Sequence, residues 1–281
     1  MKNFILKSGL VSLAAITLVA SGTTTTAPEK INLGYTGLLL TDKISISSTK
    51  ANVVKIAESE VEVTISDKKY KFDKTDLENP DGNNKNRFRK KIDDDSDVDD
   101  IYIDLLNRHH KGVQIWYVGI GHDDNYEQGY VINGDKPVKM PTDIVATYEG
   151  RLSGSMRNKT NPFNDQSSFY GDIELEVDFN NNSIAGSFYD VKTWDNDQQE
   201  DIILDGGADI TSGVIAGDKF TATITTDETL NTSMGLTQSL SGEMSGGFYG
   251  YYGTEMAGIA VLENDKYSGL AGFDANKEFK K

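Results

Sequence analysis

The second half of the chain alternates apolar and polar residues with a period of two. The run DIELEVDF (172–179) has four acidic side chains on one face, and on the other face Ile173, Leu175, Val177 and Phe179. Such alternation is typical of a β-strand with one buried face. The turn NNNS and the run IAGSFYD follow, and together they predict a hairpin. KFTATITT and SLSGEMSGGF alternate in the same way.

About eight candidate strands follow residue 143, separated by polar turns and without convincing helical periodicity. Regularly spaced strands of this kind are typical of a closed barrel or a sandwich. Glycines inside the strands indicate bends or crowded positions, which closure of a small barrel requires. The run GEMSGGFYGYYGTEMAGIAVL (242–262) then predicts a strand, a Gly/Tyr-rich turn and a second strand that is nearly apolar on both sides. We therefore expect a mainly β chain, with a C-terminal eight-stranded antiparallel barrel and a β-rich N-terminal domain.

Composition excludes several classes of function. The net charge of −16 argues against nucleic-acid binding, because phosphate binding needs a basic face. The absence of cysteine excludes disulfides, thiolate zinc sites, iron–sulfur clusters and cysteine nucleophiles. The sequence contains no G-x-S-x-G elbow, H-E-x-x-H helix or phosphate-binding loop, so we predict no catalytic residues and no enzyme activity.

The N-terminus predicts export. Lys2 and Lys7 precede a short apolar run at 10–19, which is typical of a secretory signal peptide, here residues 1–22. The stretch around 20–22 also looks like a lipoprotein signal without its acceptor cysteine. Residues 23–30 read as a flexible tether. Two prolines in KPVKMPTD then separate an N-terminal ligand- or effector-binding domain (31–140) from the barrel (143–281).

The runs ATYEGRLSG, GDIELEVDFNNNSIAGSF, GDKFTAT and GGFYGYYGTEMAGIAVL are followed by YSGLAGFDANK. Together they resemble the C-terminal eight-stranded barrel of the transferrin-binding-protein-B-like family. That family's pattern is a G-x-F-Y-G turn, an acidic residue, a glycine and a closing glycine-rich strand. Its counterparts here are Gly246–Gly250, Glu255, Gly258 and Gly269–Phe273. The resemblance covers residues 143 to 281.

The resemblance implies export through an outer-membrane translocator that recognises the barrel, and ligand specificity in the N-terminal domain. Some members of the family are surface lipoproteins that bind host iron carriers or aid host colonisation. Others, the hemophilins, are secreted haem-binding proteins without a lipid anchor. The missing cysteine fits the secreted branch and the near-lipobox fits the bacterial outer-membrane surface branch, so both localisations stay open.

An acidic run at 93–100, DDDSDVDD, follows the basic cluster RFRKK (87–91). Carboxylate oxygens are preferred calcium ligands, but the run lacks the glycine and the terminal glutamate of an EF-hand loop. The alternative is a solvated loop whose repulsion the basic cluster offsets.

All three histidines lie in or beside one predicted unit, the strands Ile101–Leu106 and Val113–Gly119 with the turn NRHHKG between them. On the second strand Trp116, Val118, Ile120 and His122 share a face. An apolar wall with one imidazole suits a haem pocket, which the family resemblance also suggests. The candidate haem-binding residues are His109, His110, His122, Trp116, Tyr117 and Tyr126.

Strand geometry limits this site. Residues 113–121 span about 30 Å when extended, so His110 and His122 reach one iron only if the chain folds back at Gly119 or Gly121. A single-histidine site, or a histidine paired with a tyrosine, is simpler. The plain alternative is that the histidines are solvated turn residues and the Trp-Tyr pair belongs to a core.

Two functions follow as hypotheses. The first is an exported binding protein that captures haem and delivers it to an outer-membrane haem receptor, as the resemblance to the hemophilin branch implies. The alternative is a bacterial surface protein that mediates host colonisation and holds no small-molecule ligand.

Overall fold

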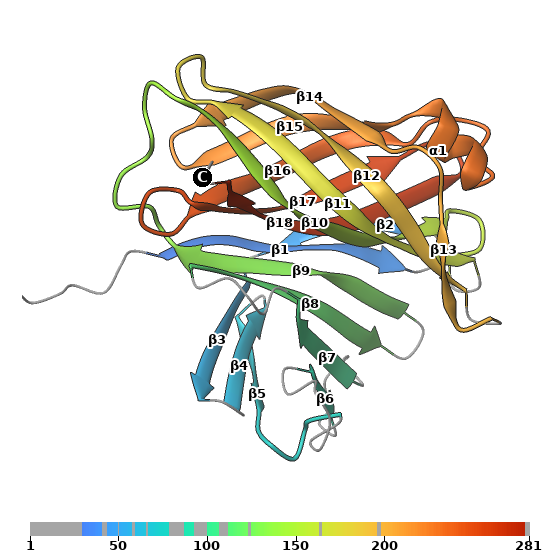
Figure 1. Cartoon of the computed structure of the whole chain (residues 1–281). Coiled ribbons are helices and arrows are strands. Elements are labelled where there is room, and N and C mark those ends of the chain that lie inside the picture. The colour runs from blue at the N-terminus through green and yellow to red at the C-terminus, as the bar shows by residue number, and fades with distance from the viewer. Residues whose placement is uncertain are drawn as a thin grey trace, which may run out of the picture.

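The computed structural model describes residues 30–40, 44–49, 51–57, 60–65, 67–78, 87–92, 100–106, 112–122, 125–162, 165–195 and 198–278. The predicted signal peptide and most of the predicted tether lie outside these residues. The described chain forms an N-terminal domain of two sheets, and above it a C-terminal barrel (Figure 1). Residues 136–144 connect the two domains and carry Pro137 and Pro141. In the part of the chain described, no helix has the length and apolar character needed to cross a membrane.

The barrel contains nine strands in one sheet. They are β10 (Val145–Asn158), β11 (Gln166–Asp178), β12 (Ser183–Asp195), β13 (Glu200–Ile203), β14 (Ala208–Ala216), β15 (Lys219–Thr226), β16 (Ser241–Tyr249), β17 (Glu255–Glu263) and β18 (Tyr267–Lys277). The strand order is β11-β10-β18-β17-β16-β15-β14-β12-β13, and β11 also pairs with β12. That pairing closes eight antiparallel strands into a barrel and leaves β13 as an extra strand, which confirms the predicted fold class.

The predicted alternation places apolar side chains inside the barrel. Ile173, Leu175 and Val177 are fully buried, and Glu174 and Glu176 between them are exposed. The sequence did not predict the short helix α1 (Glu228–Ser233). Its N-cap is Asp227, whose carboxylate accepts a hydrogen bond from the Leu230 amide at 2.6 Å. Six residues are too few to show helical periodicity in the sequence, so the cap was the available signal.

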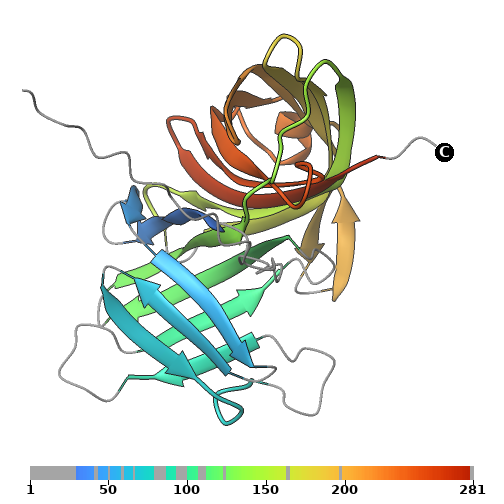
Figure 2. The ribbon, with the colours of Figure 1, turned by 90° about the vertical axis from the view of Figure 1, so that its left-hand side faces the viewer.

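The N-terminal domain stacks a three-stranded sheet on a six-stranded one (Figure 2). The six-stranded order is β2-β1-β9-β8-β7-β6, with β1 (Lys30–Leu40), β2 (Ile44–Thr49), β6 (Arg87–Lys91), β7 (Asp100–Leu105), β8 (Val113–His122) and β9 (Asn125–Asp135). The smaller sheet contains β3 (Ala51–Ala57), β4 (Glu60–Ile65) and β5 (Lys68–Phe72). A hydrophobic core that includes Val63, Phe88 and Trp116 lies between the two sheets.

The strand β8 is longer than the sequence predicted. It continues through Gly119 and Gly121 to His122, and it pairs with β9 along its whole length. The chain therefore does not fold back at either glycine. Gly119 instead makes room for a neighbour, because a Cβ there would lie 2.4 Å from the Tyr126 hydroxyl.

The domain interface explains why β17 is apolar on both sides. Met256, Ala260 and Leu262 point into the barrel core, whereas Ala257 and Ile259 pack outward against the N-terminal domain. The opposing residues come from β8 and β9, which lie below the barrel in Figure 1: Val113, Ile115, Tyr130 and Ile132. The outer wall of the barrel is thus a second buried surface at these strands.

Glycines let tyrosines cross this interface. A Cβ on Gly272 of β18 would lie 2.8 Å from the ring of Tyr130 in β9. In the opposite direction, a Cβ on Gly134 of β9 would lie 2.5 Å from the ring of Tyr249 in β16. Each aromatic ring occupies the space that a side chain on the facing strand would otherwise fill.

A carboxylate fixes the end of the interface. Glu255, the first residue of β17, accepts hydrogen bonds from the amides of Gly112 (2.9 and 3.1 Å) and Val113 (3.0 Å). Gly112 and Val113 are buried, so without Glu255 their N–H groups would lose these partners.

Replacing Glu255 is expected to destabilise the protein. We expect Glu255→Ala to lower the free energy of unfolding by about 2–3 kcal/mol, because buried donors lose a charged acceptor. The matched control is Glu263→Ala at the other end of β17, which breaks an exposed ion pair with Lys159 and should cost less than about 1 kcal/mol. Urea unfolding measures both, and equal losses would contradict the role given to Glu255.

Crowding at Gly272 gives a second test. Gly272→Ala places a methyl against the Tyr130 ring and should cost about 1–3 kcal/mol through overpacking. Gly269→Ala on the same strand is the control, since its nearest neighbour would lie at an ordinary 3.4 Å, and its effect should stay within about 0.5 kcal/mol. Thermal unfolding of the two variants would refute the packing argument if Gly272→Ala were as stable as Gly269→Ala.

Candidate binding surfaces of the N-terminal domain

The structure places the predicted histidines only in part. His109 and His110 lie outside the described residues, and His122 is described by its backbone alone, at the end of β8. Gly112, two residues after His110, lies at the other end of that strand. Ten extended residues span about 30 Å, and two residues add at most about 7 Å of reach. One iron therefore cannot be shared by His110 and His122.

Trp116 lies in the core of the N-terminal domain. It is fully buried together with Val118 and Ile120, on the side of β8 that faces the three-stranded sheet. Its indole Nε1 donates a hydrogen bond of 3.4 Å to the Gln114 side chain.

Tyr117 and Tyr126 lie on the opposite face of the sheet, toward the barrel. Burial is the main cause that raises the pKa of Tyr117, and the charge and hydrogen bond of Tyr126 raise this pKa further. The structure thus brings these two candidate residues together and separates them from Trp116, which points the other way.

Tyr117 belongs to an aromatic row across the sheet. The ring of Tyr117 makes edge-on contacts with Tyr102 at 5.9 Å and Tyr130 at 5.7 Å between centroids. Burial raises the pKa of all three phenols, so they stay neutral and donate hydrogen bonds. Tyr117 donates to the Gln128 Oε1 at 3.1 Å, and Tyr130 donates to the Ser153 carbonyl at 3.0 Å in the barrel.

A buried arginine completes this polar seam between the domains. Arg157 of β10 donates from Nη2 to the Gln128 Oε1 at 3.0 Å and from Nη1 to the Pro162 carbonyl at 2.7 Å. Gln128 in turn donates to the Ser155 hydroxyl at 2.6 Å. Burial lowers the pKa of Arg157. These contacts orient the aromatic row relative to the barrel.

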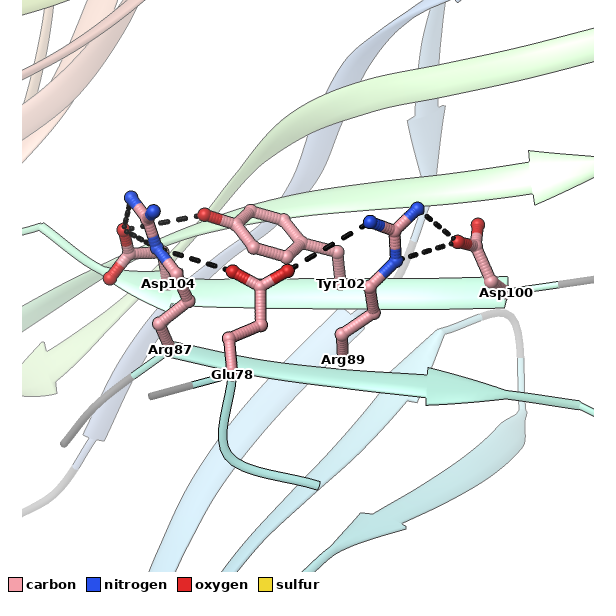
Figure 3. Close-up of polar contacts among 6 residues, drawn as sticks. All are labelled: Glu78, Arg87, Arg89, Asp100, Tyr102 and Asp104. Atoms are coloured by element: carbon pink, nitrogen blue, oxygen red, sulfur yellow. Dashed lines mark hydrogen bonds and ion pairs between the residues drawn. The ribbon is translucent and has the colours of Figure 1, made fainter. Parts of the chain in front are cut away.

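Beyond the barrel, the same face of the sheet carries a row of alternating charges on β6, β7 and the segment before β6 (Figure 3). We call it the charged ladder, and its members are Glu78, Arg87, Arg89, Asp100, Tyr102 and Asp104. Arg87 Nη2 lies 2.9 Å from Asp104 Oδ2, and Arg89 Nη2 lies 2.7 Å from Asp100 Oδ2.

Glu78 links the two pairs, at 3.8 Å from Arg87 and 3.9 Å from Arg89. Tyr102 lies between the arginines, with the Arg87 guanidinium 5.6 Å from its ring centre. The hydrogen bond to Asp100 raises the pKa of Arg89. The side chains of Arg87 and Arg89 nevertheless remain 42% and 59% exposed, so the ladder is ordered and open to a partner.

Sequence reasoning identified the basic cluster and its offset by the acidic run, but not the individual ion pairs. The acidic residues 93–99 lie outside the described residues, and the calcium prediction is untested there. Asp100, the last residue of that run, pairs with Arg89 instead. Within the described ranges no three potential metal ligands cluster. The available signal was the alternation of DIYIDL, which puts Asp100, Tyr102 and Asp104 on one face.

The barrel matches a known family. The family model for the C-lobe and N-lobe beta barrels of Tf-binding protein B covers residues 140–277. The family consists of binding proteins and not of enzymes, as the sequence predicted. No curated protein matches the chain.

Solved structures show the same fold. A variant of transferrin binding protein B from Haemophilus parasuis Hp5, a vaccine antigen, is 18% identical with a TM-score of 0.54, and the match covers 88% of this chain and 45% of that one. Intact Ap-TbpB, with its N and C lobes, is 17% identical with a TM-score of 0.51 and coverages of 88% and 46%. The chain thus spans less than half the length of these relatives. Residues 140–277 are thus similar to the C-lobe and N-lobe beta barrels of Tf-binding protein B.

Proposed function

We propose that this chain is an exported binding protein whose N-terminal domain docks a host iron-carrier protein on the charged ladder. The observation that carries the proposal is the ladder itself, in which carboxylates hold two exposed arginines in fixed geometry beside the half-buried Tyr102. The relatives with the same fold are named for transferrin, which supplies the class of partner. This role differs from the host-colonisation alternative of the sequence analysis, although it likewise needs no small-molecule ligand.

The chemistry of the ladder favours binding over stability. Exposed ion pairs contribute little to folding, typically about 0.2–1 kcal/mol each. Arginine and tyrosine are enriched among the residues that dominate protein–protein affinity. Because Arg87 and Arg89 are already held by carboxylates, a partner would meet them with less loss of side-chain freedom.

The same proposal includes export of the protein and its later contact with an outer-membrane receptor. The signal-like residues 1–22 and the family of the barrel support passage to the bacterial surface through a translocator that recognises the barrel. Homologues bind host iron carriers and work with outer-membrane receptors, so an outer-membrane receptor is the proposed next partner. Release from the cell and retention at its surface both fit these features.

The docking proposal is tested with purified transferrin as the probe. We expect the protein to bind iron-loaded transferrin measurably in biolayer interferometry. Arg89→Ala should weaken that binding at least tenfold, because it removes a pre-ordered guanidinium. The same variant should unfold within about 1 kcal/mol of the original protein, since its ion pair is exposed.

The matched control is Lys69→Ala. Lys69 is an equally exposed base, paired with Glu62 at 2.9 Å on the three-stranded sheet and away from the ladder. Its replacement should leave affinity unchanged. Absence of any binding to transferrin, or equal binding by the two variants, would overturn the docking proposal.

Haem capture is the second candidate. The observation in its favour is that His122 is the last residue of β8, the strand that carries Trp116, Val118 and Ile120. Because β8 is extended, one such site can use histidines from only one end of the strand. Titration with haemin should then give a Soret shift that depends on one end of the strand only. Either His122→Ala abolishes the shift and the double variant His109→Ala/His110→Ala preserves it, or the double variant abolishes it and His122→Ala preserves it. No shift, or a shift that survives replacement of all three histidines, would eliminate haem binding through these residues.

A further inference from the structure

The strand β13 leaves the barrel with a free edge. It pairs with the end of β12, from the pair of Lys192 with Ile203 to the pair of Asp195 with Glu200. In the described part of the chain no strand pairs with its other side. All four of its residues are exposed, and the side chain of Ile203 is 72% exposed. Figure 2 shows β12 and β13 reaching past the barrel alongside the N-terminal domain.

The hydrogen-bond pattern identifies which groups are free. The Leu204 amide donates to the Val191 carbonyl at 2.8 Å, next to the pair Lys192–Ile203. In an antiparallel ladder, hydrogen-bonded and non-hydrogen-bonded pairs alternate. The N–H and C=O groups of Ile203 and Asp201 therefore point away from β12, toward the open edge.

Other parts of the structure show how such an edge is normally covered. The edge strand β6 is closed by a preceding segment, because the Arg89 amide donates to the Asp76 carbonyl at 2.8 Å and the Glu78 amide to the Arg87 carbonyl at 3.2 Å. No described segment does this for β13. Exposed edges are templates for a further strand.

A groove of 660 Å³ runs beside β13, between the barrel wall and the N-terminal domain. Ile203 and Lys192 form its β12–β13 side, and Leu106 and Ile115 form the side of the N-terminal domain. Leu106 is 39% exposed although it is apolar. The groove thus offers an apolar contact within reach of a chain that lies along β13.

Acidic side chains outnumber basic ones around this edge. The groove is lined by Arg151 and Lys192 and by three carboxylates, and β13 adds two more: Asp172, Asp190, Asp274, Glu200 and Asp201. The Tyr170 hydroxyl donates to Asp201, and this hydrogen bond raises the pKa of Tyr170 to about 12. An added strand with basic side chains complements this charge, whereas a second copy of a chain with net charge −16 does not.

We propose that the free edge of β13 receives an extended, basic segment of a partner polypeptide, which adds to the sheet as a further strand. Main-chain hydrogen bonds to Asp201 and Ile203 hold the segment, and one apolar side chain rests against Ile203 and Leu106. This surface lies on β13 of the barrel and is separate from the charged ladder, so either can fail without the other.

The probe is a fluorescent seven-residue peptide of alternating lysine and valine with blocked ends. We expect saturable binding to the full protein by anisotropy. Ile203→Pro should weaken it at least tenfold, because proline removes an outward N–H without touching the hydrogen bonds to β12. Ile203→Ala, which loses the side chain but keeps the N–H, should weaken it less, by about threefold.

A second arm uses the unaltered protein and does not depend on the folding of any variant. Two versions of the same peptide are N-methylated at alternate residues, one on each edge of the extended peptide. Both keep the charge of the peptide, and each loses strand pairing along its methylated edge. One version should bind at least tenfold more weakly than the other. Equal binding of both methylated peptides and the unmodified one, or no binding of the unmodified one, would overturn strand addition.

Discussion

The structure depends on one contact, the apolar outer face of β17 and β18 against β8 and β9. Barrel strands normally bury one face, yet here Ala257, Ile259 and Leu270 are buried on the outside as well. The N-terminal domain is therefore packed on the barrel wall. Glu255 closes one end of this contact by accepting the Gly112 and Val113 amides, and the Arg157–Gln128 seam adds polar contacts on the same sheet face.

This contact divides the six-stranded sheet into a covered and an open part. The barrel covers β8 and β9, and β6 and β7 extend beyond it with Arg87 and Arg89 exposed. The aromatic row from Tyr130 through Tyr117 to Tyr102 connects the two parts. A rigid scaffold thus presents an ordered, charged surface, which is what a binding protein needs to limit the entropy lost on association.

The barrel was predictable because strand alternation depends only on local sequence, as at Ile173, Leu175 and Val177. The site was harder. The sequence predicted Trp116 and His122 on one face of β8 and offered a core position for Trp116 only as the alternative, because burial by a second sheet is a tertiary property. A site shared by two histidines would have needed a chain reversal at Gly119 or Gly121, and at Gly119 the glycine accommodates Tyr126 instead. The partners of Arg87 and Arg89 depend on strand register between β6 and β7, a tertiary property that no local pattern reveals.

The central claim is that the two domains form one packed unit. Differential scanning calorimetry tests it most directly, because domains that share a buried apolar interface and a bound carboxylate should unfold together. The account predicts a single transition whose calorimetric and van't Hoff enthalpies agree. Two separable transitions, with the N-terminal domain melting while the barrel stays folded, would contradict it.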